Sequence, residues 1–582
     1  MLSRTVAIVL GVVMNCMVAF DVRANDGKAV FFGDLHVHTR YSLDAITFGT
    51  FSGPADAYRF AMGYPLKMLD GSWYQLDRPL DFLSVTEHAF GLGEYALCVE
   101  QTTSAAWQME VCRELRSGKG PGGIQPFLAG RAKVPPARNA AVCGDDGTAC
   151  VDAAVGPWQA IQADAAAFNN PGKFTTFIGF EWTPADRFRR TVHRNIIFRN
   201  DKVTARAMSV FEYPLVADFW GWLDSACTGE CEALVIPHNS NFSGGLMFSP
   251  TDEVGDEFTV EDWERRARFE KLVEIYQVKG ASECMVGFGV TDEECNFEQF
   301  LPACGAESNG RCASPPGFAR EGLLIGLGKI AELGFNPMQF GFIGSTDTHT
   351  SAGGAVSESR YPGHHSGLDQ TPEAALTGKI AGGQSIYKFT PGGLAAIWAT
   401  ENTREALFAA MKRRETYATS GTRIKLRFSA NGQPMGSVVT SKPAFRVVAE
   451  RDVLSAPLHK LQIIKGWVDQ SGVAQESVTD IACAVGEPDN GVCPPQPSDL
   501  DVAACNLPRE GSARIVADWQ DPRFDATLDA FYYVRAIEAP VCRWTTVIAR
   551  HLGQPPPADV PATIQERAWS SPIWYTALQS RP

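Results

Sequence analysis

The chain has 582 residues, of which 45% are hydrophobic, and its formal net charge at pH 7 is −14. This length exceeds one ordinary hydrophobic core and predicts at least two domains, for which the hydrophobic fraction is ample. The negative charge argues against nucleic acid as a partner, because a polyanion requires a basic surface. Ordinary solubility accounts for a charge of this size.

Residues 1–24 read as a signal peptide. Arg4 precedes an apolar run that begins at Val6, and the small side chain of Ala24 suits cleavage before Asn25. A membrane anchor is the alternative, but the run is interrupted and shorter than the roughly 20 apolar residues of a spanning helix. We therefore expect an exported protein, periplasmic or secreted, with no membrane span in the mature chain.

The cysteines support export. Of 15 cysteines, one (Cys16) lies in the expected signal peptide, which leaves 14. Most are close neighbours in polar loops, which favours local disulfides in an oxidising compartment, and the absence of a CxxC pair argues against zinc fingers. Joining sequential neighbours predicts the pairs Cys98–Cys112, Cys143–Cys150, Cys227–Cys231, Cys284–Cys295, Cys304–Cys312, Cys483–Cys493 and Cys505–Cys542.

An apolar, strand-like segment at residues 29–32 leads into His36 and His38. Alternate residues of a strand face the same side, so these two imidazoles can share one metal ion. Two strand histidines on a solvated face would give the same pattern. The HxH motif alone is therefore a weak signal.

Four further apolar runs, at residues 81–85, 174–180, 234–237 and 340–344, lead into residues of metal-ligand type. Glu87 and His88 follow the first run, Glu181 and then His193 follow the second, His238 follows the third, and Asp347 and His349 follow the fourth. Barrels of the α/β class place their chemistry in this way, at the carboxyl ends of the strands. The sequence therefore predicts a metal site at the mouth of an α/β barrel.

The order HxH, Glu-His, Glu, His, His and DxH resembles the PHP (polymerase and histidinol phosphatase) superfamily of metal-dependent phosphoesterases. The segments at 401–404, 414–421 and 566–575 resemble a secreted bacterial branch of it, known mainly as a domain of unknown function. The resemblance covers nearly the whole mature chain. It implies a distorted (β/α)7 barrel with a metal centre and leaves the substrate open.

The resemblance also implies two or three divalent metal ions (Zn, Mn or Fe). The first would take His36, His38, Glu181 and Asp347; the second Glu181, His193 and His238; and the third His88, His349 and Asp44. Asp44 stands where trinuclear members usually carry a histidine, so the identity of the metals and the occupancy of the third position stay open. A turn-capping role for Asp44 and ligand-orienting roles for His88 and His193 are the alternatives.

Hydrolysis of a phosphoester requires a strong nucleophile and neutralisation of the charge on the phosphoryl oxygens. Two cations roughly 3.5–4 Å apart do both, by bridging a hydroxide and clamping the substrate. Glu181 is the expected carboxylate bridge, because it follows a strand and lies between the flanking histidine clusters. We expect an exported hydrolase, most simply a phosphoesterase using a metal-bridging hydroxide on a small-molecule anionic ester. Cleavage of a carboxylic ester, amide or sulfate ester is the first alternative, and a metal-stabilised binding protein is the second.

In addition to Glu181, four residues are candidate catalytic or substrate-binding groups. Arg194 and Lys279 would meet an anionic substrate, and His364 or His365 would supply a general acid for the leaving group. Solvated loop side chains are the alternative reading. The arginines that would form a positive pocket are Arg40, Arg187, Arg189, Arg190 and Arg194. No GxSxG motif is present, which argues against a serine hydrolase.

Residues 25–421 alternate apolar runs with helical patterns and predict the barrel domain. Helices are expected at 55–69, 158–169, 262–271, 318–333 and 403–414. Insertions at 93–157 and 281–316, each with four cysteines, interrupt this pattern. They predict pocket-shaping loops, with disulfide-stapled decoration as the alternative. Short alternating strands in residues 422–582 predict a C-terminal antiparallel β-sandwich-like domain. The oligomeric state is open.

Overall fold

The computed structural model describes residues 27–185, 190–287, 290, 292–305, 312–380, 383–495 and 499–577. The expected signal peptide at 1–24 and the expected pocket residues Arg187 and Arg189 lie outside these residues. Within the described ranges, no helix has the length and apolar character needed to span a membrane.

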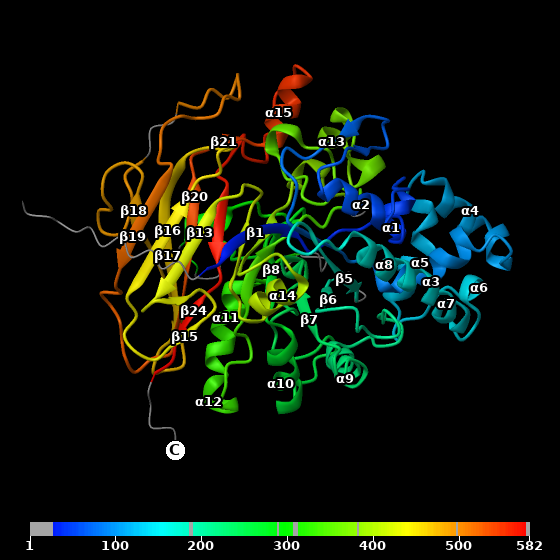
Figure 1. Cartoon of the computed structure of the whole chain (residues 1–582), viewed down its shortest axis with the longest axis horizontal. Coiled ribbons are helices and arrows are strands. Elements are labelled where there is room, and N and C mark those ends of the chain that lie inside the picture. The colour runs from blue at the N-terminus through cyan, green and yellow to red at the C-terminus, as the bar shows by residue number, and fades with distance from the viewer. Residues whose placement is uncertain are drawn as a thin grey trace, which may run out of the picture.

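A large mixed sheet runs through the middle of the molecule (Figure 1). Its N-terminal part contains, in this order, β1 (Ala29–Asp34), β4 (Phe82–Val85), β5 (Thr175–Trp182), β6 (Arg194–Phe198) and β7 (Ala233–Pro237). The strands β1, β4 and β5 are parallel, whereas β6 is antiparallel to both of its neighbours. The described residues between β5 and β6, 183–185 and 190–193, contain no crossover helix, and the two strands form an antiparallel pair, which needs only a short connection.

The expected distorted (β/α)7 barrel is not closed among the described residues. The strands β8 (Leu272–Gln277) and β10 (Gly341–Gly344) belong to a separate sheet with β9 (Gly280–Ala281). This sheet lies against β7 on one side and against β11 (Leu394–Ala399) and β12 (Thr416–Thr419) on the other. No ladder of hydrogen bonds joins it to the large sheet, so the described strands form an open, curved arrangement.

Most of the expected helices are present. They are α2 (Pro54–Ala61), α8 (Val155–Phe168), α10 (Val260–Phe269), α11 (Ala319–Gly328) followed by α12 (Ile330–Leu333), and α14 (Arg404–Lys412). The helix expected over residues 55–69 is wrong beyond Ala61. Gly63 has a φ of 93° and ends the helix, and β2 (Leu66–Lys67) pairs with β3 (Trp73–Tyr74) instead.

The insertion at 93–157 is helical and lies at the end of the molecule opposite the C-terminal strands (Figure 1). Its region holds α3 (Leu92–Tyr95), α4 (Glu110–Ser117), α5 (Gln125–Arg131), α6 (Ala140–Cys143) and α7 (Thr148–Ala153). Two disulfides join its turns, and all seven disulfides predicted from neighbouring cysteines are confirmed.

The C-terminal region has two layers of strands. One is an antiparallel sheet of β14 (Gln433–Pro434), β13 (Lys425–Ala430), β16 (Phe445–Glu450) and β19 (Arg514–Trp519). The other contains β17 (Leu458–Val468), β18 (Ala474–Cys483) and β20 (Ala530–Glu538). Apolar side chains from both layers, among them Phe428, Val447, Ile463 and Val534, form the core between them.

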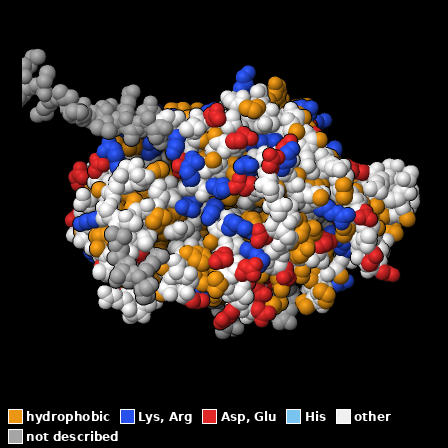
Figure 2. All heavy atoms as spheres, turned by 60° about the horizontal axis from the view of Figure 1, so that its bottom comes forward, with side chains coloured by type: hydrophobic (Ala, Val, Ile, Leu, Met, Phe, Trp, Pro, Cys, Tyr) orange, Lys and Arg blue, Asp and Glu red, His pale blue; other side chains and the backbone are white. Residues whose placement is uncertain are grey.

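The second layer is not a sheet of its own. The strand β23 (Arg567–Ser570) pairs with β12 on one side and with β20 on the other, so the large sheet continues from the barrel region into the C-terminal region. The two predicted domains therefore share one sheet. On the face shown in Figure 2, acidic and basic side chains are interspersed.

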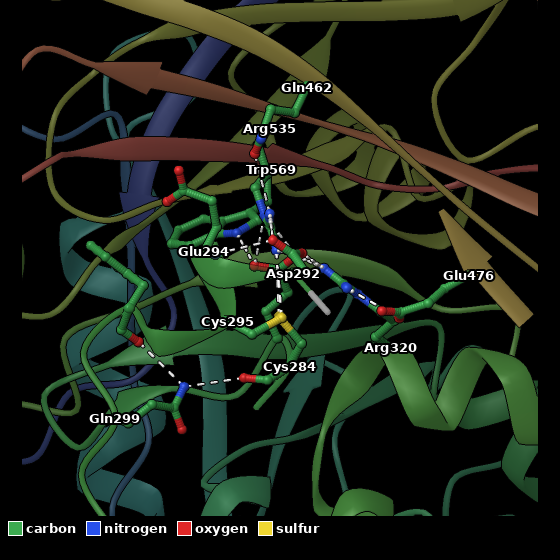
Figure 3. The surroundings of a disulfide bond; sticks show 12 residues. Cys284, Asp292, Glu294, Cys295, Gln299, Arg320, Gln462, Glu476, Arg535 and Trp569 are labelled. Carbon is green, nitrogen blue, oxygen red and sulfur yellow. Dashed lines mark hydrogen bonds and ion pairs between the residues drawn. A yellow bond between two sulfur atoms is a disulfide. The ribbon is translucent and has the colours of Figure 1, made fainter. Parts of the chain in front are cut away.

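A buried set of four charged residues, which we call the junction cluster, joins the insertion at 281–316 to the C-terminal strands (Figure 3). Its members are Glu283, Asp292, Arg320 and Arg535. The Nη2 atom of Arg535 lies 2.8 Å from Asp292 Oδ2, and the Nη2 atom of Arg320 lies 2.7 Å from the same oxygen. These contacts fix the second insertion against β20.

Candidate metal centre

The segments that follow β1 and β10 run side by side and bring the two histidine motifs together. The backbone N–H of Asp347 donates to the carbonyl of His36 at 2.9 Å, and that of His38 donates to the carbonyl of Thr348 at 2.9 Å. Asp347 has a φ of 55°, a left-handed conformation that is uncommon for a non-glycine residue. The two backbone bonds hold this conformation, which aims the carboxylate at the histidines.

Glu181, near the end of β5, lies at the centre of the histidines. Its Oε2 atom is 3.3 Å from His38 Nε2 and 3.0 Å from His88 Nδ1. Its Oε1 atom is 2.9 Å from His193 Nδ1 and 3.3 Å from His238 Nε2. Each carboxylate oxygen therefore faces a different set of imidazoles, which is the geometry of a carboxylate that bridges two ions.

His36 and His38 share Asp347 as a second carboxylate. The Oδ1 atom of Asp347 lies 3.2 Å from the Nε2 atom of each histidine, and these two nitrogens are 3.1 Å apart. Two ring nitrogens this close together can direct their lone pairs at one shared cation. Together with Glu181, these residues form the first group expected from the sequence.

Asp44, in the short helix α1 (Leu43–Thr47), completes the third expected group. Its Oδ2 atom is 3.1 Å from His88 Nε2 and 3.3 Å from His349 Nε2. His38 also lies within ligand distance of His88 and His349, so it belongs to two groups where the sequence analysis assigned it to one. The side chain of Asp44 is 30% exposed, which makes this the open side of the centre.

His193 reaches the centre by an unexpected route. It precedes the antiparallel strand β6, whereas the other histidines follow parallel strands or lie at loop positions after them. Because β6 runs backward, its first residues lie at the same edge of the sheet as the last residues of β5 and β7. All nine ligand candidates are thus gathered in one cluster, which is buried except at Asp44 and His193.

Several atoms of the cluster have no hydrogen-bond partner among the described residues. They are Glu181 Oε2, His193 Nε2, His238 Nδ1 and His238 Nε2, all buried. Buried polar groups are normally satisfied, so unpartnered ones within a cluster of ligand-type side chains indicate a site for a ligand. Carboxylate oxygens and imidazole nitrogens are the donors that Zn, Mn and Fe accept, and the residues present therefore fit such cations.

The charges of the cluster are strongly coupled. Burial disfavours its ionised forms, but the neighbouring imidazoles hold the pKa of Glu181 well below its usual range. The carboxylates of Asp44 and Glu181 raise the pKa of His88 to about 10 against the effect of burial. Burial lowers the pKa of His193 to about 3 and that of His349 to about 4, which keeps these imidazoles neutral and able to bind a cation.

Three of the imidazoles are oriented by a second polar group. Glu274 of β8 lies 3.1 Å from His36 Nδ1, Ser42 Oγ lies 2.9 Å from His38 Nδ1, and Thr183 Oγ1 lies 2.9 Å from His88 Nδ1. Such contacts fix the tautomer and the ring direction of a ligand histidine. Glu274 was missed by the sequence analysis, although an acidic residue inside an apolar strand was an available signal.

Two further contacts support the loops of the centre. The carboxylate of Glu87 accepts the backbone N–H of Thr39 at 3.1 Å and the hydroxyl of Ser42 at 2.5 Å, so Glu87 holds the loop after the HxH motif. The side-chain amide of Gln277 donates to Asp347 Oδ2 at 3.0 Å. Gln277, from the end of β8, was also missed.

The other candidate catalytic residues are divided between the centre and its surroundings. The ammonium of Lys279 contacts Asp347 Oδ2, and the side chain of Lys279 is 23% exposed. Arg194 points away from the cluster, since its Nε donates to Glu270 at 2.7 Å and its guanidinium packs over Trp182. The alternation along β6 explains this, because His193 and Arg194 face opposite sides of the sheet.

The two neighbouring histidines of the loop after β10 differ in their surroundings. His364 is buried with both nitrogens engaged, at 2.8 Å from Thr348 Oγ1 and 2.7 Å from the carbonyl of Pro391. The ring of His365 stacks on that of His349 with centroids 5.4 Å apart, and its Nδ1 lies 3.3 Å from Asp369. Only His365 therefore has a ring nitrogen left for a substrate.

Arg131, from the first insertion, also reaches the centre. Its Nη1 donates to the carbonyl of Thr183 at 3.1 Å, two residues from Glu181. Nothing in the sequence around Arg131 marks it, because its position depends on how the whole insertion packs.

The open, mixed α/β sheet and its cluster of histidines and carboxylates make this an α/β protein with a candidate metal centre. The chain belongs to the family described as "Protein of unknown function (DUF3604)", which matches residues 25–431 and 428–577. An uncharacterized protein of Chlamydia pneumoniae is 25% identical over 292 residues, which are 50% of this chain. The match is 36% of that protein, so this chain spans about a third of the length of this curated relative.

One solved structure aligns with most of the chain. It is a two-domain protein containing a predicted PHP-like metal-dependent phosphoesterase from Bacteroides vulgatus, with 9% identity and a TM-score of 0.30. The alignment covers 87% of this chain and 91% of that one.

Proposed function

We propose that this protein is an exported, metal-dependent hydrolase of the phosphoesterase type, with a PHP-like centre in an opened barrel. The observation that carries the proposal is the position of Glu181, whose two oxygens face separate sets of imidazoles. A bridging carboxylate of this kind is characteristic of catalytic centres with two or more cations. The matching order of motifs along the sequence adds support.

The residues would divide the work as follows. Divalent cations, when bound, supply charge neutralisation and lower the pKa of a water molecule. Glu181, Asp347 and the surrounding imidazoles hold those cations in place, and Glu274, Ser42 and Thr183 fix the rings. Lys279, whose partly exposed side chain lies beside Asp347, would meet an oxygen of an anionic substrate.

We assign proton donation to the leaving group to His365. Asp369 orients its ring, and the side chain of His365 is 12% exposed. His364 is better suited to holding the loop, because both of its nitrogens already have partners. General acids of this kind contribute typically 10²–10⁴-fold to a rate, and about the lower value is expected here for a good leaving group.

Accessibility favours catalysis over a purely structural role. Structural metal sites are closed by protein ligands, whereas catalytic ones keep an open position. Here the side chain of Asp44 is 30% exposed and that of Lys279 is 23% exposed, so the cluster is open on this side. Export is proposed from the seven disulfides and the signal peptide expected at 1–24, since disulfides persist in oxidising compartments.

The test is turnover by the metal-loaded protein on chromogenic phosphomonoester, phosphodiester, carboxylic-ester and sulfate-ester substrates, with Mn, Zn or Fe added. We expect phosphoester hydrolysis that is lost in Glu181→Gln. Glu332→Gln is the matched control, because Glu332 lies on α12 and its side chain is 61% exposed. Turnover of a carboxylic or sulfate ester alone would indicate a hydrolase of another bond. No turnover with metals bound would favour a metal-stabilised binding protein.

A further inference from the structure

Arg131 is brought to the metal centre by the first insertion. It is the last residue of α5, in an insertion joined by the disulfides Cys98–Cys112 and Cys143–Cys150. Its hydrogen bond to the carbonyl of Thr183 ties it to the residue that also contacts His88 and Glu181. The insertion thus places a guanidinium beside the centre without using a residue of the sheet.

The guanidinium has partners on two sides and none at its Nε atom among the described residues. Its Nη1 atom is used by Thr183, and its central carbon lies 4.4 Å from the centre of the Phe90 ring. Its Nε atom is buried and has no partner among the described residues. The Nε and Nη2 groups form one edge of the planar fork, which is the edge that takes two oxygens of an oxyanion side by side.

Two other arginines of the protein are arranged differently. Arg138, in the same insertion, lies 2.8 Å from oxygens of both Glu94 and Glu212. Arg266 lies 3.1 Å from Glu270. Arg131 has no such carboxylate within ion-pair distance among the described residues, although Asp44 and Glu181 are near enough to act on its charge.

A buried donor without a partner costs free energy, so it marks a place where a ligand completes the site. Burial lowers the pKa of Arg131 to about 10, which leaves the group charged at neutral pH. The charged guanidinium lies beside a cluster that could hold cations. It can therefore bind those negatively charged oxygens of a substrate that the cations leave free. Both Asp44, whose side chain is 30% exposed, and the buried Glu181 act on the charge of Arg131.

We propose that Arg131 binds the terminal oxyanion of the substrate and makes the centre selective for phosphate or sulfate monoesters over diesters. This inference rests on the proposed function. A monoester has three non-bridging oxygens, so the fork can take oxygen atoms that remain after two are directed at the cations. A diester has only two non-bridging oxygens and leaves the fork without an equivalent partner.

The first experiment measures binding, which needs no turnover. Inorganic phosphate and inorganic sulfate are titrated calorimetrically into the metal-loaded protein, as wild type, Arg131→Gln and Arg131→Lys. One charge-assisted hydrogen-bonded pair is expected to be worth about 10- to 100-fold in affinity. We expect Arg131→Gln to weaken phosphate or sulfate by about this factor, and Arg131→Lys to restore part of it, because lysine keeps the charge and loses the fork. The anion that loses more affinity identifies which of the two the fork fits.

The matched control is Arg113→Gln, in the same insertion, where the guanidinium is exposed and donates to the carbonyl of Gln108. It should bind phosphate as the wild type does. Metal content and circular dichroism identify any variant that has lost its fold. Unchanged anion affinity in Arg131→Gln, or no anion binding by the wild type, would overturn the inference.

The second experiment measures selectivity with p-nitrophenyl phosphate and bis-p-nitrophenyl phosphate. Arg131→Gln should lower kcat/KM for the monoester about 10- to 100-fold and change that for the diester by less than about 3-fold. Equal losses on both substrates would mean that Arg131 only anchors the insertion. If the wild type hydrolyses neither ester while its phosphate affinity depends on Arg131, the proposed hydrolase fails and the anion site stands.

Discussion

The protein contains two buried clusters of charged residues that are built in opposite ways. In the junction cluster, two arginines and two carboxylates contact one another, and Trp569 Nε1 adds a hydrogen bond to Glu283 at 2.6 Å (Figure 3). None of its four charged members has a buried atom without a partner among the described residues. In the metal centre, carboxylates and imidazoles converge and several buried atoms are unpartnered.

The difference separates a cluster that is complete from one that requires a ligand. Burying a charge is costly unless a partner offsets it, and the arginines supply that partner at the junction. At the centre, Lys279 pairs with Asp347, whereas the partners of Glu181 and Asp44 are imidazoles, which leaves these carboxylates suited to cations from outside the chain. Proximity of ligand-type residues alone does not make a metal site: Cys284, Asp292 and Cys295 are also close, but a disulfide offers no thiolate.

The largest effect is expected from Asp347→Asn. This change removes a negative charge that faces His36 and His38 and lowers the affinity for cations. Loss of several kcal/mol of transition-state stabilisation corresponds to about 10³-fold or more in kcat. Metal content and turnover measure the result. The fold should persist, because the sheet and the seven disulfides do not depend on this carboxylate.

The control for Asp347→Asn is Asp518→Asn, at an exposed ion pair with Arg446 on the surface of the C-terminal strands. It should leave both metal content and turnover unchanged. Full activity in Asp347→Asn with metal retained would show that the centre does not use this residue.

A mutation in the junction cluster should lower the free energy of unfolding and leave the metal content unchanged. Arg535→Met leaves Glu283 and Asp292 buried with less positive charge, and breaking a buried pair costs about 3–5 kcal/mol of unfolding free energy. Urea denaturation measures this loss, while the metal content of the folded protein should be unchanged. Arg446→Met, at the exposed pair, should cost less than about 1 kcal/mol.

A chelator separates the two clusters without a mutation. Cations bound at the proposed centre would stabilise the folded state, so their removal should lower the free energy of unfolding by about 2.7 kcal/mol when the free metal had been at 100 times its Kd. The melting temperature of the wild type should fall on chelation, and that of Asp347→Asn should move little. Equal shifts in both proteins would place the stabilising metal elsewhere.

Local patterns predicted which residues gather in the cluster and which cysteines pair better than they predicted the architecture. All nine ligand candidates could be found from polar residues near buried strands or within the motif order, and cysteines close in sequence paired as expected. Such features depend on short segments. The direction of β6 and the sharing of one sheet by both halves could not be read in this way, because periodicity marks a strand but not its partner.

The missed residues have the same cause. Glu274 meets His36 across 238 positions of sequence, and Arg131 meets Thr183 only because the insertion folds back over the sheet. Arg194 was chosen for its closeness to His193 in sequence, yet a strand turns neighbours to opposite faces. Contacts of this kind follow from tertiary packing rather than from any local signal.

The smallest effect concerns a third group of buried acids, beside the junction of the two halves, where the carboxyls lack the arginines of the junction cluster. Burial raises the pKa of Glu538 to about 8 and that of Glu566 to about 8. The hydroxyl of Ser455 contacts the first at 2.5 Å, and Ser420 contacts the second. In the junction cluster, by contrast, Arg535 and Arg320 hold the pKa of Glu283 below its usual value despite burial.

The pKa of Glu566 is raised and that of Glu283 is lowered, so the two groups change the free energy of unfolding with pH in opposite directions. Between the usual glutamic acid pKa and about 8, the folded protein keeps a proton on Glu566 that the unfolded chain has released, so stability falls as pH rises through this window. The slope is about 1.4 kcal/mol per pH unit for each proton. Glu566→Gln, which stays neutral, should reduce the fall in melting temperature between pH 6 and pH 8. Parallel curves for the variant and the wild type would show that Glu566 is already ionised in the folded protein.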